Sequence, residues 1–61
     1  MIQLTKLDDR RLVLNDDLIE FIESTPDTVI TLTTGRKIIV KEQVEDIIDD
    51  IVNYRRRLYA R

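Results

Sequence analysis

The fold is decided by residues 28–52, which read TVITLTTGRKIIVKEQVEDIIDDIV. Up to Lys41, β-branched and aliphatic residues dominate, and Thr34-Gly35 divides them into two runs, 28–33 and 36–41. This pattern predicts two strands joined by a tight turn, in which the glycine supplies a positive φ. After Lys41 the apolar residues recur with the spacing of an amphipathic helix. The sequence therefore predicts strands followed by a helix.

The predicted helix covers about residues 42–60. Its apolar stripe consists of Val44, Ile47, Ile48, Ile51 and Val52, and it continues with Leu58 and Tyr59. Carboxylates gather at its start, at Glu42, Glu45, Asp46, Asp49 and Asp50, and arginines at its end, at Arg55, Arg56, Arg57 and Arg61. Because the helix dipole is positive at the N-terminus and negative at the C-terminus, both groups of charges stabilise this helix.

The beginning of the chain predicts a β-hairpin. Residues 2–7 and 12–14 are rich in aliphatic side chains and flank the turn-prone Asp8-Asp9.

The threonines of the later strand 28–33 are expected to face solvent, and a hydroxyl ladder along a partner strand is the alternative. These threonines are Thr28, Thr31 and Thr33.

Residues 15–28 contain an ambiguous segment between two turns. Apolar and polar residues alternate in 18–23 as in a strand, whereas Asn15 ahead of them suits the cap of one or two helical turns. A strand is favoured, because the residues that follow stop the pattern. Pro26 fits the second position of a type I turn, and Asp27 can hydrogen-bond to its own backbone.

Together these elements predict an α+β fold, with a small antiparallel β-sheet of about five short strands followed by one C-terminal amphipathic helix. We expect a single domain over residues 1–61. At this length, the free energy gained by burying apolar surface roughly cancels the conformational entropy that folding costs. A small sheet with one helix also leaves strand edges unpaired, and such edges favour pairing with another chain. We therefore expect a homo-oligomer.

The composition argues against catalysis. The sequence contains no cysteine and no histidine, so it has no disulfide, thiol nucleophile, imidazole base or usual zinc ligand. Ser24 has no base to activate it, and Gly35 alone cannot form a glycine-rich phosphate loop. The acidic pairs lack the spacing of a calcium loop and are explained by turns and a solvated helix face. These pairs are Asp8-Asp9, Asp16-Asp17 and Asp49-Asp50. We expect no enzyme activity, no catalytic residue, no cofactor and no metal.

Charge and hydropathy restrict the partners and the location. The net charge is −2, from 12 acidic and 10 basic residues, which disfavours binding to nucleic acid. No run approaches the ~18 apolar residues of a membrane span. The first residues also lack the basic start and the apolar stretch of a signal peptide. We expect a cytoplasmic protein.

The basic C-terminal segment is the candidate surface for contact with partners. Its arginines are Arg55, Arg56, Arg57 and Arg61, and two tyrosines lie among them. Such a segment fits an acidic protein surface, and it also allows peripheral contact with anionic lipid or contact with RNA phosphates. Without a partner, the same arginines would complement the helix dipole while their aliphatic stems cover the core.

The segment from Leu14 to Glu42 carries the most specific pattern in the chain. It consists of Leu14-Asn15, Leu18-Ile19-Glu20, Ile22-Glu23, Thr25-Pro26-Asp27-Thr28, Ile30, Leu32-Thr33, Gly35 and Val40-Lys41-Glu42, and Met1-Ile2, Leu4-Thr5 and Leu7 extend it. The chain resembles the small flagellar protein family FlbD, also called the SwrD swarming-motility family. The resemblance reaches about Val52, and its most specific part includes the signature turn Thr25, Pro26, Asp27 and Thr28. Asp8-Asp9 and Thr34-Gly35 depart from the pattern, which bears on loop geometry alone.

The resemblance implies a bacterial cytoplasmic protein that is made alongside flagellar components and supports motility through the motor. It implies no catalysis, and it assigns no binding residue. We therefore expect a non-catalytic adaptor that binds flagellar motor, stator or assembly proteins at the cytoplasmic side of the motor. The exposed face of the helix and its arginines are the expected contact surface.

The alternative is a small dimeric RNA-binding translational regulator resembling the carbon storage regulator family. That family shares the length and the order of short strands followed by one helix. A dimer would place Lys6, Lys41 and the arginines on shared edges. However, the Gly-Asp turn of that family and its basic residue ahead of the helix have no match in register here. The acidic balance also disfavours RNA.

Overall fold

The computed structural model describes residues 1–59, with Tyr59 described by its backbone alone. The elements are β1 (Ile2–Thr5), β2 (Arg11–Leu14), the 3-10 helix η1 (Asp16–Leu18), β3 (Ile19–Glu23), β4 (Thr28–Leu32), β5 (Lys37–Val40) and α1 (Val44–Tyr59). Antiparallel strands followed by one C-terminal helix confirm the predicted α+β fold.

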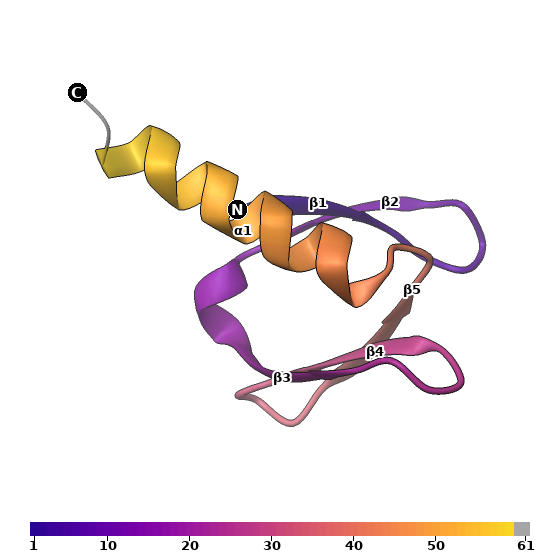
Figure 1. Cartoon of the computed structure of the whole chain (residues 1–61). Coiled ribbons are helices and arrows are strands. Elements are labelled where there is room, and N and C mark those ends of the chain that lie inside the picture. The colour runs from indigo at the N-terminus through magenta and orange to yellow at the C-terminus, as the bar shows by residue number, and fades with distance from the viewer. Residues whose placement is uncertain (60–61) are drawn as a thin grey trace.

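The strands form two antiparallel sheets that lie one above the other (Figure 1). One sheet is the β1–β2 hairpin, and the other is the meander β3–β4–β5. An isolated bridge between Lys6 and Val40 joins the two sheets at one end. Next to it, the backbone N–H of Lys41 donates to the carbonyl oxygen of Thr5 at 2.8 Å. The five strands therefore make a sandwich that backbone pairing closes at one corner.

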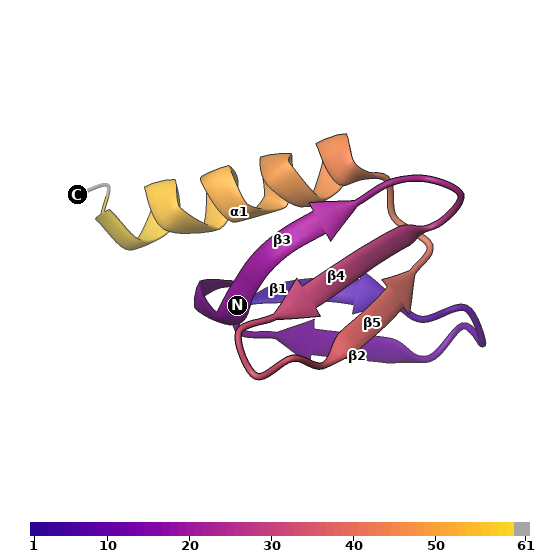
Figure 2. The same ribbon diagram turned by 90° about the horizontal axis from the view of Figure 1, so that it is seen from below.

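The core lies between the two sheets and the inner face of α1. Its buried side chains are Ile2, Leu4, Leu14, Ile30, Leu32, Val40 and Ile47. The helix lies along the side of the sandwich where β1 and β3 run (Figure 2). It contributes Ile47, which is 0% exposed, as its most deeply buried side chain. Because the helix covers only this side, the side where β2 and β5 run has no helix over it.

The start of α1 differs slightly from the prediction, at Val44 instead of about residue 42. The carboxylate of Glu42 accepts hydrogen bonds from the backbone N–H and the hydroxyl of Thr5, both at 2.8 Å. These bonds hold Glu42 against β1, so the chain enters the helix only afterwards. The predicted charge polarity is confirmed, with Glu45 and Asp46 in the first turn and arginines in the last. Residue 60 lies outside the described residues.

Both interpretations of the ambiguous segment are realised, one after the other. The side chain of Asn15 accepts a hydrogen bond from the backbone N–H of Asp17 at 3.1 Å and caps η1. The favoured strand follows directly as β3, so Leu18 belongs to the helical turn and residues 19–23 to the strand. The register of β3 against β4 shifts between Ile19 and Phe21.

The connection between β4 and β5 is longer than the tight turn that the sequence predicts at Thr34-Gly35. The β4–β5 connection spans residues 33–36 instead of a two-residue turn, and the backbone N–H of Leu32 donates to the carbonyl of Arg36 at 2.8 Å. Gly35 has the predicted positive φ, at 91°. Residues 25–27 form a bend at a cis Thr25–Pro26 bond. The change of chain direction predicted at Pro26 and Asp27 is present there, between β3 and β4.

Two of the threonines in β4 and its vicinity are buried, so the expectation that they face solvent is wrong for them. Thr28 and Thr31 are buried, whereas Thr33 is exposed as expected. Thr31 lies on the central strand between its cross-strand partners Phe21 and Lys37. Larger neighbours on both sides shield a central position from water. Within the described chain, the Thr31 hydroxyl is buried without a hydrogen-bond partner.

Two strands, β2 and β3, have an edge with no partner within the part of the chain that the structure describes, and the edge of β5 away from β4 is paired only at Val40. There β2 pairs with β1 alone, and β3 pairs with β4 alone. These are the open edges on which the expectation of a homo-oligomer rests. Among residues 1–59, no helix combines the length and the apolar content that crossing a membrane requires.

Candidate partner-contact surface

The candidate arginines at the end of α1 do not all have the same role, because Arg55 is anchored within the molecule. Its Nε lies 3.3 Å from Oδ2 of Asp16, and its Nη2 lies 2.9 Å from Oδ1 of Asp17. Both partners belong to η1, which precedes β3 in the chain. Arg55 therefore ties the second half of α1 to the turn that leads into the three-stranded sheet.

Asp16 is the buried carboxylate at the centre of this cluster, with 4% of its side chain exposed. Its Oδ1 accepts a hydrogen bond from the ammonium group of Met1 at 3.0 Å, and its Oδ2 accepts the bond from Arg55. Burial raises the pKa of Asp16, but the hydrogen bonds from these cationic donors and from its own backbone outweigh burial. The pKa of Asp16 is therefore held below its usual range, and the carboxylate stays ionised at neutral pH.

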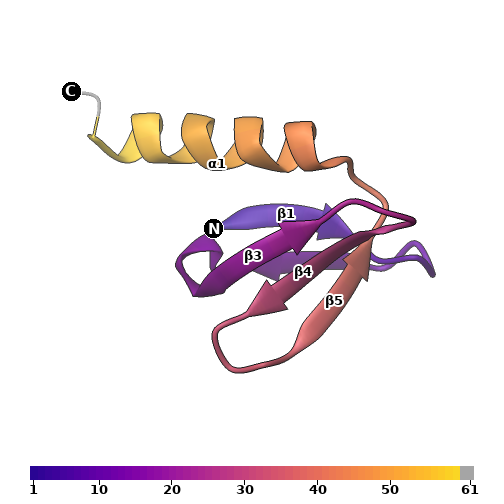
Figure 3. The ribbon, with the colours of Figure 1, turned by 60° about the horizontal axis from the view of Figure 1, so that its bottom comes forward.

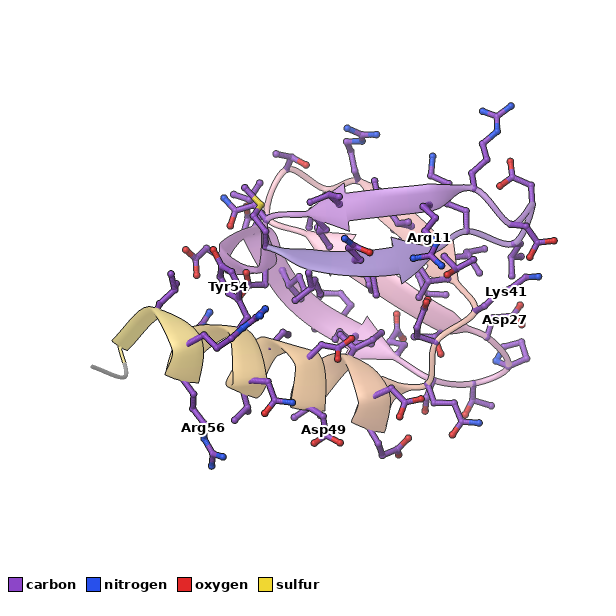
Figure 4. The ribbon with its side chains drawn as sticks, turned by 90° about the horizontal axis from the view of Figure 1, so that it is seen from above. Arg11, Asp27, Lys41, Asp49, Tyr54 and Arg56 are labelled. Carbon is purple, nitrogen blue, oxygen red and sulfur yellow. The ribbon has the colours of Figure 1, made fainter. Side chains whose placement is uncertain are left out.

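The remaining arginines lie on the part of α1 that extends past the strands (Figure 3). Arg56 points away from the sheets (Figure 4). Arg57 lines a depression of about 340 Å³ together with Tyr54 and the first residues of β1. Within residues 1–59, neither arginine lies in an ion pair. Arg61, the last candidate, lies outside the described residues.

The apolar residue at the end of the stripe is also exposed to solvent. Leu58 is 51% exposed, although it continues the line of Ile47 and Ile51 along the helix. Along this line the helix is thus buried at Ile47, half-buried at Ile51 and exposed at Leu58. Exposed cations beside an exposed aliphatic side chain form a surface that can bind another protein.

The signature segment lies at the other end of the molecule, where it faces the start of α1. Pro26, Asp27 and Thr28 line a cleft of about 510 Å³, and Thr25 precedes them in the chain. The remaining lining residues are Leu7, Ser24, Val40, Lys41, Gln43, Val44 and Glu45. Figure 4 shows Asp27 and Lys41 at this end of the sandwich. The signature segment and the arginines are therefore separate candidate surfaces.

Glu42 fixes the chain beside this cleft. Burial raises the pKa of its carboxyl, but the hydrogen bonds from the backbone and the hydroxyl of Thr5 outweigh burial. The pKa of Glu42 is therefore lowered from its ordinary value. The ionised carboxylate connects the start of the helix to the end of β1.

Two of the three acidic pairs, Asp8-Asp9 and Asp16-Asp17, form ion pairs with basic groups of the chain. Asp8 pairs with Arg10, with Oδ2 and Nε 3.4 Å apart, and Asp9 pairs with Lys41. Asp9 also adopts a positive φ of 69° in the β1–β2 turn. Within the described residues, no group of three carboxylates is placed to hold a metal ion.

The comparison with protein families gives one match. The model of the FlbD family, described as flagellar and swarming motility proteins, matches residues 1–59. The chain belongs to the FlbD family. This match confirms the resemblance in the sequence and relates the chain to flagellar and swarming motility. The match includes the signature segment and Arg55, Arg56 and Arg57. No curated protein and no solved structure matches the chain.

The sequence alone did not reveal two exposed apolar surfaces of this FlbD-family chain. The first is the outer face of the three-stranded sheet, which no other element covers in Figure 2. Phe21 and Ile39 are exposed there, beside the half-buried Val29. Apolar residues on both faces of these strands were visible in the sequence, but the face that turns outward depends on the register between strands.

The second surface lies on α1. Ile48 and Val52 are 50% and 42% exposed, although the sequence places them in the apolar stripe. They stand one helical turn apart, next to the buried Ile47 and the half-buried Ile51. The apolar stripe is wider than the part of the helix surface that contacts the sheets, so one side of the stripe stays exposed.

Proposed function

We propose that this FlbD-family chain is a non-catalytic accessory protein of flagellar motility. It acts as an adaptor that contacts motor, stator or assembly proteins at the cytoplasmic side of the flagellum. The family match supports the role in motility. The observation that supports contact is the extending end of α1, with the exposed side chains of Arg56, Arg57 and Leu58.

The anchored part of the helix supports this role. Because Arg55 and Asp16 hold α1 against η1, the free turn beyond them has a fixed direction. A surface that is positioned in advance loses less conformational entropy when it binds. Two exposed cations also favour an acidic partner through electrostatic complementarity.

The experiment compares two double variants in a motile host whose own copy of the gene is deleted. The variant R56E/R57E reverses the charge of the free turn, and R56K/R57K keeps the charge. We expect deletion to impair swimming or swarming, R56K/R57K to restore motility, and R56E/R57E to fail at equal protein level. Normal motility of the deletion strain would refute the proposed function. Normal motility with R56E/R57E would refute the contact surface.

A photo-crosslinking residue in place of Arg56 identifies the partner directly. We expect it to capture a flagellar motor, stator or assembly protein in motile cells. The same residue in place of Val13, on the hairpin sheet and away from α1, is the control. Capture of the same protein from both positions would contradict a specific role for the helix end. Binding of the purified protein to anionic vesicles, lost in R56E/R57E, would instead assign the arginines to a membrane surface.

RNA binding as a translational regulator is the alternative function, and the family match favours motility over it. Several basic side chains are already engaged with carboxylates, namely Arg10, Lys41 and Arg55. RNA binding requires a concentrated basic face, so the pairing of these side chains with carboxylates disfavours it. A salt-dependent shift of RNA by micromolar protein in a gel would support the alternative.

A further inference from the structure

The side of the sandwich opposite to the helix contains an apolar groove. It has a volume of about 440 Å³ and lies between the β1–β2 turn and strand β5. Leu7, Leu12, Ile38 and Ile39 form its apolar part, and Leu7 and Ile39 are exposed. Along β5, the edge away from β4 is paired only through the bridge of Val40 to Lys6 within the described chain. The groove is thus lined by apolar side chains and by an open strand edge.

The rim of this groove is basic. Lys6, Arg36 and Lys37 line it, and none of them lies in an ion pair among the described residues. The single carboxylate of the lining, Asp8, is paired with Arg10. The rim therefore carries unbalanced positive charge, which favours an occupant that is both apolar and acidic.

The outer face of α1 is both apolar and acidic. Ile48 and Val52 form its apolar part, and the carboxylates of Glu45 and Asp49 border them. Both carboxylates are exposed, and within residues 1–59 neither lies in an ion pair. In Figure 4, Asp49 points away from the sheets. Apolar residues four positions apart are the usual anchors of a helix that docks into an apolar groove.

The two surfaces cannot meet within one molecule, because they lie on opposite sides of the sandwich. Figure 2 shows α1 along one side and β5 and β2 at the other. We propose that the chain assembles head to tail, with the outer face of α1 from one copy docked in the β2–β5 groove of the next. In this contact Ile48 and Val52 face Leu7 and Ile39 of the neighbour, while the carboxylates meet its basic rim.

This arrangement determines the kind of assembly. The two contact surfaces are different, so the interface is heterologous, and each copy has one free groove and one free helix face. Such contacts produce a closed ring when the rotation between neighbours closes, and an open filament when it does not. The inference concerns self-association and does not depend on the proposed role in motility.

Two charge-reversal variants test the proposal. R36E/K37E disables the groove but keeps the helix face, and E45K/D49K disables the helix face but keeps the groove. Light scattering after size-exclusion chromatography of the wild type is expected to show species larger than a monomer. Each variant alone should be monomeric, with association at least about tenfold weaker, because like charges face each other at the interface. An equimolar mixture should associate again with the two variants alternating, because the acidic helix face of one meets the basic groove of the other and the two reversed surfaces are also opposite in charge.

The matched control is E20K/D50K, which makes the same charge change at exposed positions outside both surfaces. It should assemble like the wild type. Circular dichroism checks that every variant is folded, and the milder pair R36Q/K37Q and E45Q/D49Q replaces any variant that is not. A monomeric wild type at high micromolar concentration would overturn the proposal. Failure of the folded mixture to associate, or wild-type assembly of either variant alone, would overturn it as well.

Discussion

The two ends of α1 share the same spacing of apolar residues, but these residues have different environments. In the first half Ile47 is completely buried, whereas Leu58, which is on the same stripe, is half exposed. The difference arises because the sheets extend along only part of the helix (Figure 3). Hydrophobic periodicity therefore identifies the face of a helix that is able to pack. The length of the neighbouring strands determines how much of that face is buried.

Among the substitutions that test this comparison, that of Ile47 should have the largest effect on the free energy of unfolding. I47A leaves a cavity at the centre of the core and is expected to lower the free energy of unfolding by about 2–5 kcal/mol. A domain of this size has only a few kcal/mol in total, so the variant should be partly or completely unfolded. The neighbouring I48A removes a half-exposed side chain and should cost less than about 1 kcal/mol in the monomer. Urea denaturation measures both, and equal effects would contradict the packing described here.

Removal of the Asp16 carboxylate should have the next largest effect. D16A leaves the ammonium group of Met1 and the guanidinium of Arg55 without their buried acceptor. The expected loss is about 1–3 kcal/mol, because both donors can partly return to water. A thermal melt of D16A beside D17A provides the comparison, since Asp17 is exposed and contacts Arg55 alone. A larger loss in D17A would show that the wrong carboxylate has been identified as the anchor.

The strands and the helix were predictable from the sequence because their signals are local. Alternation, the glycine at position 35 and the spacing of apolar residues identified the elements to within a few residues. The start of α1 was not predictable, because it depends on Glu42 reaching Thr5, which lies 37 positions earlier. The joining of the two sheets at one corner depends in the same way on the bridge between Lys6 and Val40.

Acid should weaken the attachment at the first end of the helix. The pKa of Glu42 is lowered in the folded protein, so its contribution to stability is complete above the ordinary glutamate pKa of about 4.3. This contribution is lost as the pH falls through the lower folded value. E42Q should cost about 1 kcal/mol at pH 7, and the difference from the wild type should shrink below about pH 4. Urea denaturation at several pH values tests this, and a difference that grows in acid would contradict it.

The smallest expected effect distinguishes the anchored arginine from the free one. R55A breaks two partly exposed ion pairs and should cost less than about 1 kcal/mol. R56A should leave stability unchanged within experimental error, because Arg56 makes no ion pair within residues 1–59. Addition of salt should reduce the effect of R55A, since partly exposed charges are screened. An effect of R56A equal to that of R55A would remove the distinction between the anchored arginine and the free one.

The candidate site was harder to predict than the fold. The four candidate arginines look equivalent in the sequence, and the long-range contact with η1 distinguishes Arg55 from the others. Sequence spacing carries no signal for a pair of residues 39 positions apart. The exposed faces that contain Phe21 and Ile48 were equally hidden, because an apolar side chain in a periodic pattern looks the same whether it is covered or not.

The corner where Thr5 meets Lys41 and Glu42 also bears on how the chain folds. Each hairpin and the helix form between residues that are close in sequence, so these steps are fast. The corner joins Thr5 to Glu42, which lies 37 positions later, and it closes a loop of more than half of the chain. Contacts of such long range slow folding, so this corner should form late. Variants at Thr5 or Glu42 are therefore expected to speed unfolding while leaving the refolding rate nearly unchanged.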